Sequence, residues 1–570
     1  MKKHLIVALA ALGFAACNQS DEMDSPIHNG EIEESYIAIN LMSADANTRA
    51  ATDSYGYEDG TELERAVKSA YFFFFNAEGQ PFNVTGAPAT APGGEKNHLS
   101  LTIGETTGKV DPNVSDIKNA VLILKTYKGV YPSKIVAVLN WTPEDKAYTL
   151  EELHKVVENS LGNETQGYVM SNSVYMDGAG NMVDAVPLTA ANIKTTEAAA
   201  LAAPIDICVE RTAAKVVLTA SGKVSDTNIF DTQKNSTPIL TTGTSSEIDV
   251  YVKLHGWELY NDYSSTSLLK NIDKSWNVET LGLTWNDIPY YRCYWAESQD
   301  TTPGDSFAWK YDDSNKTTKG FQTNYGFNVA SAANYTDRST YTYCGENTNG
   351  EALRTKVILK GQLMQKNGVN YEPLELARWY GTEYAGNEAL RTAVANSLKY
   401  TLYYKDGENY ISIKPEDIQC VAGSSVSAEA YEVGFQLSTT SQNKTWYLYS
   451  SENGYVVFGD NGVNGDNASK TNAYLASVEP ALLYAEGQTY YYIDIKHLGA
   501  AGKTAEYGVV RNHVYQIDIE SITGYGSPIY NGNSNLENPE YPTVDESSYV
   551  AARINVLSWK VVKQGVDIVQ

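Results

Sequence analysis

Short runs of β-branched and aromatic residues recur along most of this chain, with turn-forming residues between them. Residues 119–127 (NAVLILKTY) and 133–141 (SKIVAVLNW) are almost continuously apolar, which is typical of buried strands. Residues 513–522 (HVYQIDIESI) alternate between apolar and polar side chains until Ile522, which is typical of a strand with one buried face. The sequence therefore predicts an all-β fold.

Two segments depart from this pattern and predict short helices. In residues 149–157, Thr149 and Glu152 have the spacing of a capping box. The apolar face of this helix is expected to consist of Leu150, Leu153, Val156 and Val157. Residues 387–400 predict the second helix, because three apolar side chains recur there at helical spacing, namely Leu390, Val394 and Leu398.

The length of 570 residues suggests two or more domains. Residues 205–220 predict two strands around a polar break, and residues 221–246, rich in Ser, Thr, Asn and Asp, predict a boundary loop. We therefore expect an N-terminal domain over residues 50–222 and a C-terminal domain over residues 245–528. Residues 529–570 contain a polar linker followed by an apolar terminal segment.

The N-terminus carries an export signal. Residues 1–17, MKKHLIVALAALGFAAC, combine two lysines, an apolar run too short to span a membrane, and small residues before Cys17. This pattern predicts a lipoprotein signal peptide, whose removal leaves a lipid-modified Cys17; the alternative is an ordinary signal peptide with a chance cysteine. The polar, acidic residues 18–35 predict a flexible tether.

The amino-acid composition limits the kinds of molecule that this chain is expected to bind. The formal net charge of −26 argues against nucleic acid or an anionic lipid surface. The 42 tyrosines are compatible with strands and with contact surfaces that are partly apolar and partly hydrated, because tyrosine has an apolar ring and a polar hydroxyl. The cysteines after Cys17 are too widely spaced for a zinc site. Their even number permits disulfides, but we expect none among Cys208, Cys293, Cys344 and Cys420.

No pattern of catalytic or metal-binding residues stands out. The seven histidines include no pair at metal-ligand spacing, and neither a G-x-S-x-G motif nor a P-loop occurs. The segment GDNGVNGDN (459–467) only weakly resembles a calcium loop, because Gly462 takes a ligand position and the distal Glu is missing. We therefore expect no enzyme activity, no cofactor and no metal site.

Residues 35–42 predict a strand that shortly precedes a single arginine. Ile37, Ile39 and Leu41 share one face of this strand, and Arg49 follows in a polar loop. A protease that cuts after Arg49 would release the strand and expose an apolar groove with unpaired backbone groups. The alternative is that residues 35–42 form an ordinary first strand and that Arg49 is an ordinary loop residue.

The C-terminal segment 551–570 predicts one or two strands with no hairpin partner nearby. Its apolar residues change phase between Val556 and Leu557, which predicts a β-bulge. Such a strand either docks on its own domain or pairs with the sheet edge of another chain. The candidate residues for a donated strand are Ile554, Val556, Leu557, Trp559, Val561, Val566 and Ile568.

Several stretches resemble the Bacteroidetes fimbrillin family, and the resemblance extends over nearly the whole chain. They include AVKSAYFFFFNAEGQP (66–81), VERTAAKVVL (209–218) and LHGWELYN (254–261). The more specific feature is YGVVRNHVYQIDIESITGYGSP (507–528) followed by INVLSWKVV (554–562). Within this family the chain is most similar to the major (stalk) subunit of the minor, or short, fimbriae.

The resemblance implies two tandem transthyretin-like β-sandwich domains and export to the outer membrane as a lipoprotein. It implies that an arginine-specific protease cuts between Arg49 and Ala50, which removes the propeptide 18–49; Arg65 is an alternative site. The C-terminal segment then acts as the donor strand for the next subunit. The implied partners are identical subunits, anchor and tip subunits, the protease and a surface receptor, in a cell-surface fimbrium used for adhesion and biofilm formation. The alternative is a non-polymerising surface lipoprotein, or an anchor or accessory subunit, that binds glycan or host protein.

Overall fold

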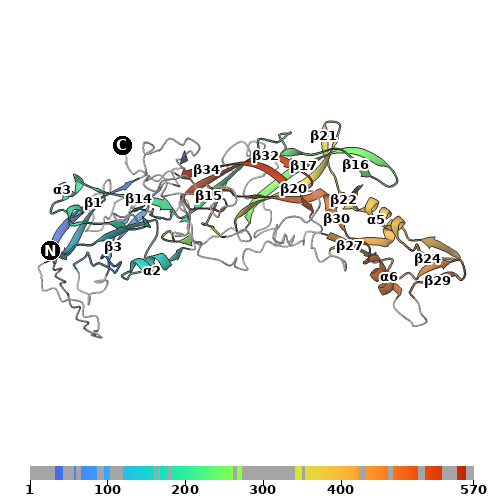
Figure 1. Ribbon diagram of the computed structural model, residues 1–570, viewed down its shortest axis with the longest axis horizontal. Coiled ribbons are helices and arrows are strands. Elements are labelled where there is room, and N and C mark those ends of the chain that lie inside the picture. Colours follow the sequence, from blue (N-terminus) through green and yellow to red (C-terminus); the bar gives the residue numbers. More distant parts are fainter. Residues whose placement is uncertain are drawn as a thin grey trace, which may run out of the picture.

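The chain forms an elongated molecule built mostly of β-strands, with a few short helices (Figure 1). This is a computed structural model. It describes residues 32–42, 57–58, 64, 66–86, 96–102, 120–158, 162–163, 167–173, 175–176, 182–260, 266–271, 341–349, 354–422, 432–459, 467–497, 507–528 and 549–559. The predicted all-β class is confirmed, whereas the division into two tandem transthyretin-like sandwiches stays a prediction.

One end of the molecule contains an eight-stranded sheet with the order β4-β3-β6-β10-β14-β1-β5, and β13 pairs beside β6. Helix α2 (Leu150–Lys155) begins at Thr149, whose side chain forms the expected capping box with Glu152, and α3 (Glu197–Leu201) lies against β1. The strands are β1 (Ile32–Met42), β3 (Ser69–Phe75), β4 (His98–Thr102), β5 (Ala120–Tyr127), β6 (Lys134–Leu139), β10 (Met170–Asn172), β13 (Val186–Pro187) and β14 (Ile205–Arg211).

The apolar core of this end draws on strands from across the whole sheet. Strands β3 and β6 are almost continuously apolar, and successive side chains enter two different clusters, so each strand sends apolar side chains to both faces of the sheet. One cluster joins Phe72 and Phe74 of β3 to Ile37 and Ile39 of β1. Because β3 and β1 are separated by three other strands in the sheet, the sheet must curve around this cluster.

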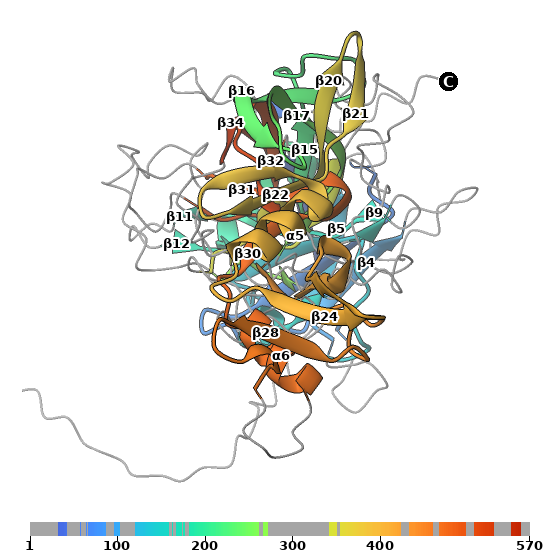
Figure 2. The same cartoon turned by 90° about the vertical axis from the view of Figure 1, so that its right-hand side faces the viewer.

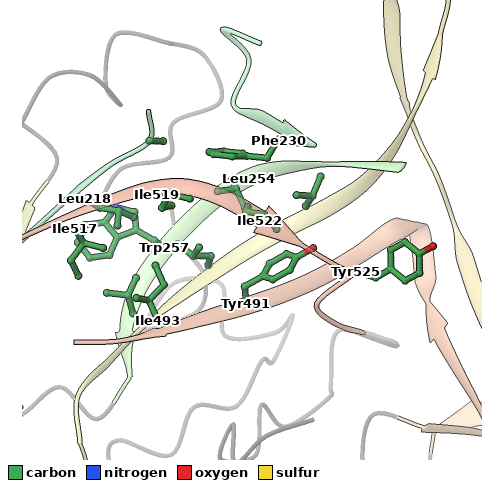
Figure 3. Packing of buried hydrophobic residues seen from close by; sticks show 14 of the residues in the cluster. Leu218, Phe230, Leu254, Trp257, Tyr491, Ile493, Ile517, Ile519, Ile522 and Tyr525 are labelled. Atoms are coloured by element: carbon green, nitrogen blue, oxygen red, sulfur yellow. The ribbon is translucent and has the colours of Figure 1, made fainter. Parts of the chain in front are cut away.

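The other half of the molecule contains a five-stranded sheet, β19-β15-β32-β34-β2, that faces part of an eleven-stranded sheet. Their inner faces meet in one large apolar cluster around Trp257 (Figure 3). The five strands are β2 (Tyr57–Glu58), β15 (Ala214–Thr219), β19 (Tyr341–Cys344), β32 (His513–Thr523) and β34 (Tyr549–Trp559). The eleven are β16 (Ile229–Leu240), β17 (Ser245–Tyr260), β20 (Lys356–Asn367), β21 (Asn370–Pro373), β22 (Leu376–Trp379), β23 (Thr382–Ala385), β26 (Ile418–Ala422), β27 (Glu432–Leu437), β30 (Ala481–Tyr484), β31 (Gln488–Asp494) and β33 (Ser527–Pro528).

The far end of the molecule carries a four-stranded sheet with the order β25-β24-β28-β29, beside helices α5 (Gly386–Ser397) and α6 (Asn467–Leu475). Figure 2 views the molecule toward this end. The strands are β24 (Leu402–Asp406), β25 (Asn409–Ser412), β28 (Trp446–Ser450) and β29 (Gly454–Val457). The sheet and both helices enclose a separate apolar cluster that contains Trp446, Leu390, Val394 and Leu475.

The two halves are joined directly. Strand β14 of the first sheet ends at Arg211 and β15 of the second begins at Ala214, so the polar break predicted in residues 205–220 is confirmed. Buried polar contacts surround this junction. The Lys215 Nζ atom lies 2.8 Å from Glu64 Oε1, and the Arg211 Nε atom donates to the Glu64 carbonyl oxygen at 2.8 Å.

Three expectations from the sequence are wrong. Residues 221–246 are no simple loop, because they contain β16, which pairs with β17 around two irregularities of register. Its polar composition hid this strand, since many of its side chains face solvent. Val157 lies outside the α2 helix and belongs to the two-residue strand β7 (Val157–Glu158). The bulge between Val556 and Leu557 is absent, because β34 pairs with β32 in continuous register there; the irregularity instead falls between Ile519 and Ser521.

Candidate functional site

Strand β1 occupies an internal position in the first sheet, between β5 and β14. It pairs antiparallel with β5 from Ile32 to Ile39 and parallel with β14 from Ile39 to Met42. Near Tyr36 it also pairs with Lys194, through backbone bonds of 2.7 and 2.9 Å. The strand therefore has backbone partners along both of its edges.

The side chains of β1 are buried on both faces of the sheet. Ile37 and Ile39 enter the main core of this half, where Leu122, Ile205 and Ile207 belong to the same cluster. On the opposite face, Ala38 packs with Val121 and with Ala200 of α3. Burial of one such isoleucine contributes about 1.5–3 kcal/mol, so loss of β1 would open an apolar groove between β5 and β14. Leu41 lies in β1, where its Cα partner is Ile207.

The predicted cleavage residues Arg49 and Ala50 lie outside the described residues, as does Cys17. They fall between β1 in the first sheet and β2, which pairs with β34 in the five-stranded sheet. After β2, Glu64 is held at the junction of the two halves: besides Lys215, the Tyr343 hydroxyl donates to its carboxylate. Burial, with Glu64 as the hydrogen-bond partner, raises the pKa of Tyr343. The chain on either side of residues 43–56 is thus tied to different sheets.

The predicted donor segment begins within β34, which already pairs with its own chain. Antiparallel register with β32 runs from Thr523↔Tyr549 to His513↔Ser558. At the end of β34, Ser558 and Trp559 also pair with β2. Ile554, Val556, Leu557 and Trp559 therefore lie in an internal strand of the five-stranded sheet, while Val561, Val566 and Ile568 lie outside the described residues.

Sequence reasoning found β1 and the terminal strand but missed the partners of both. The parallel pairing of β1 with β14 links residues more than 160 positions apart, for example Ile39 and Ile205, and no local pattern signals it. The pairing of β34 with β32 was hidden by the intervening polar stretch, residues 529–548.

The described part of the chain contains no cluster of His, Cys, Asp and Glu side chains that could hold a metal ion. His497 and His513 approach each other with ring centroids 5.1 Å apart, but both are buried: Tyr515 bonds His497, and the Arg511 carbonyl bonds His513. In the same described residues, no helix is both long and apolar enough to cross a membrane. The calcium-like segment 459–467 lies largely outside them.

The chain is therefore an elongated β-sheet protein in which β1 completes the first sheet. The predicted cleavage site at Arg49 follows β1 in the sequence. Residues 482–565 match the family model described as "Major fimbrial subunit protein type IV, Fimbrillin, C-terminal". The match supports the family resemblance over residues 482–565, whereas the assignment to the stalk of short fimbriae stays a prediction. The matched region includes β31, β32 and β34. No protein with a curated description matches the chain.

Solved structures resemble the chain loosely. A fimbrilin (fimA) from Porphyromonas gingivalis W83 is 12% identical, with 93% of this chain and 98% of that chain covered and a TM-score of 0.37. A putative cell adhesion protein from Parabacteroides distasonis is 14% identical, with 93% and 100% covered and a TM-score of 0.34. The tip fimbrial protein Mfa3 from Porphyromonas gingivalis is 10% identical, with 92% and 100% covered and a TM-score of 0.26. At such TM-scores these likenesses carry no further conclusion.

Proposed function

We propose that the chain is a structural subunit of a cell-surface fimbria and that its subunits polymerise by protease-triggered donor-strand exchange. In this proposal the precursor is a lipoprotein anchored through Cys17 to the outer membrane. An arginine-specific protease cuts between Arg49 and Ala50 and removes β1. The C-terminal segment of a neighbouring subunit then fills the groove, which gives an open head-to-tail filament that serves adhesion and biofilm formation.

The position of β1 is the observation that carries this proposal. An internal strand whose loss leaves two sheet edges unpaired makes the cut chain a strong acceptor. A strand that replaces β1 must fill the space of its buried isoleucines. Apolar side chains at alternate positions, such as Ile554 and Val556, suit this groove. The family match at residues 482–565 supports a fimbrial subunit.

The first test is the N-terminal residue of protein sheared from cells, measured by mass spectrometry. We expect Ala50, together with a ladder of polymers on mildly heated gels. Arg49→Ala is expected to retain the precursor and to abolish the ladder, whereas Arg65→Ala, the matched control, leaves both unchanged. A lipidated Cys17 at the N-terminus of wild-type protein, with no ladder, would overturn the proposal.

A second candidate function rests on β34. Because this strand pairs with β32 along nearly its whole length, the chain suits a non-polymerising surface lipoprotein, or an anchor or accessory subunit, that keeps its own terminal strand. Wild-type protein that forms no polymer ladder supports this second function. If a ladder forms, a chain that ends at Trp559 locates the donor, since it retains β34. Loss of the polymer ladder in this variant assigns donation to the tail with Val561, Val566 and Ile568, whereas an unchanged ladder assigns it to β34 itself.

A further inference from the structure

The four-stranded sheet at the far end of the molecule has one buried and one open face. Trp446, Tyr404 and Leu448 pack on the buried face with the helices α5 and α6. Paired residues in neighbouring strands share a face, so the register assigns the positions of the opposite face. Those positions are Tyr403, Lys405, Tyr410, Ser412, Tyr447, Tyr449, Tyr455 and Val457.

The five tyrosines of this face form one continuous cluster. The rings of Tyr410 and Tyr455 are stacked, with centroids 3.7 Å apart and planes at 4°. Three further rings contact this pair. The Tyr403 ring meets Tyr455 and the Tyr447 ring meets Tyr410 edge-on, with centroids 5.1 and 5.2 Å apart, while the Tyr449 ring is tilted, with its centroid 5.1 Å from that of Tyr455. The cluster is thus preorganised by its own ring contacts, which lowers the entropy cost of binding.

Two properties of the cluster point to a ligand. Tyr449 is 61% exposed, although a large aromatic side chain favours burial. Among the described residues, none of the five hydroxyl groups has a hydrogen-bond partner. Aromatic ring surfaces and free phenol hydroxyls therefore lie side by side on an open sheet face.

We propose that this face, the tyrosine face, binds the pyranose rings of an uncharged polysaccharide. The C–H face of a pyranose is apolar and packs on an aromatic ring, while its hydroxyls exchange hydrogen bonds with phenol groups. Charge selects the class of glycan. The tyrosine face has one cation, Lys405, and no carboxylate among its eight positions, while the chain as a whole carries −26. The negative net charge imposes no repulsion on a neutral glycan, whereas it repels a sulfated or uronic acid polymer.

This inference is independent of strand exchange, because the four-stranded sheet with β24 and β29 lies at the opposite end of the molecule from β1 (Figure 1). The test is affinity electrophoresis of the full chain in gels that contain mannan, dextran or laminarin, with heparin and alginate as anionic comparators. We expect retardation by at least one neutral polysaccharide and none by the anionic pair. Tyr449→Ala and Tyr410→Ala should each raise the dissociation constant about tenfold, and Tyr410→Phe, which keeps the stack, should raise it less.

Tyr380→Ala is the matched control, because Tyr380 is 71% exposed on the separate β22–β23 hairpin. It should leave retardation unchanged, and circular dichroism should confirm that every variant folds. The proposal would be overturned if heparin alone retarded the chain or if none of the neutral polysaccharides did. It would also be overturned if Tyr380→Ala reduced the retardation as much as Tyr449→Ala does. Self-association of the chain through this face would also overturn the proposal. It would appear as a molecular mass that rises with protein concentration in the wild type but not in Tyr449→Ala, while neither protein binds glycan.

Discussion

Glu346 and Arg511 form a buried ion pair, in which Arg511 Nε donates to Glu346 Oε2 at 3.0 Å. The rest of the guanidinium donates to the carbonyl oxygens of Ser267 and Leu268 and to the hydroxyl of Thr266. One arginine therefore ties the turn before β32 to the segment around β18 (Thr266–Ser267), which pairs with β7 beside α2. The contact network connects the two halves of the molecule.

The first prediction concerns this ion pair. Glu346→Gln removes the direct ion-pair partner of the buried Arg511 and leaves only the more distant charge of Glu210, which should lower the free energy of unfolding by about 3–5 kcal/mol. Glu151→Gln is the control, since Glu151 pairs with Lys155 on the exposed surface of α2 and should change stability by less than about 1 kcal/mol. Urea unfolding measures both. Equal effects of the two substitutions would contradict the assigned role of the buried pair.

The second prediction concerns the packing of β1. Ile39→Ala creates a cavity in the core of the first sheet and should lower the stability of the uncut chain by about 2–5 kcal/mol. Ile32→Ala, at the start of the same strand and 47% exposed, should have little effect. Thermal unfolding of the uncut chain compares them. If β1 is removed on maturation, the cut protein with either substitution must unfold identically to wild type.

The third prediction concerns acid stability. Burial, with the nearby charge of Lys96, lowers the pKa of His98 from 6.5 to about 4. Between these two values the unfolded chain binds a proton that the folded chain does not, so stability falls as the pH drops from 6.5 to 4. Burial likewise lowers the pKa of His255 to about 4, with Lys253 adding to it. His98→Gln should therefore flatten part of the fall in melting temperature.

His154 provides the opposite control. Burial alone disfavours its charged form, but its hydrogen bond and ion pair with Asp184 raise the pKa of His154 above 6.5. Its contribution to stability is therefore present in acid and is lost as the pH rises through the folded-state value. His154→Gln should steepen the acid loss of stability that His98→Gln flattens. Parallel pH profiles of the two variants would contradict both assignments.

The fourth prediction concerns thiol reactivity. Burial raises the pKa of Cys420 to about 12, and its thiol donates to Asn387 Oδ1 at 3.2 Å. The thiol of Cys344 is buried as well, and neither forms a disulfide. Peptide mapping after alkylation at pH 8 should show both cysteines unmodified in the native chain and modified after denaturation. Rapid native labelling of Cys420 would show that its surroundings open readily.

The sequence predicted the strands and helices whose pattern of apolar and polar residues can be recognised within a short segment. Strand β1, helix α5 and the capping box of α2 were all readable, because alternation and cap spacing lie within a few residues. Strand β16 was not, since its polar, outward-facing residues give no alternation. The tyrosine face was missed for a different reason: its residues come from four strands, and only the pairing register brings Tyr410 and Tyr455 into contact.

The two-residue passage from β14 to β15 has a mechanical consequence. Thr212 and Ala213 are fully buried, and β15 then runs beside β32 in parallel register along the length of the molecule (Figure 1). A pull applied at the two ends of the molecule reaches β15 along its own axis. In that geometry the load would act in shear on the hydrogen bonds between β15 and β32, which would have to break together instead of one after another.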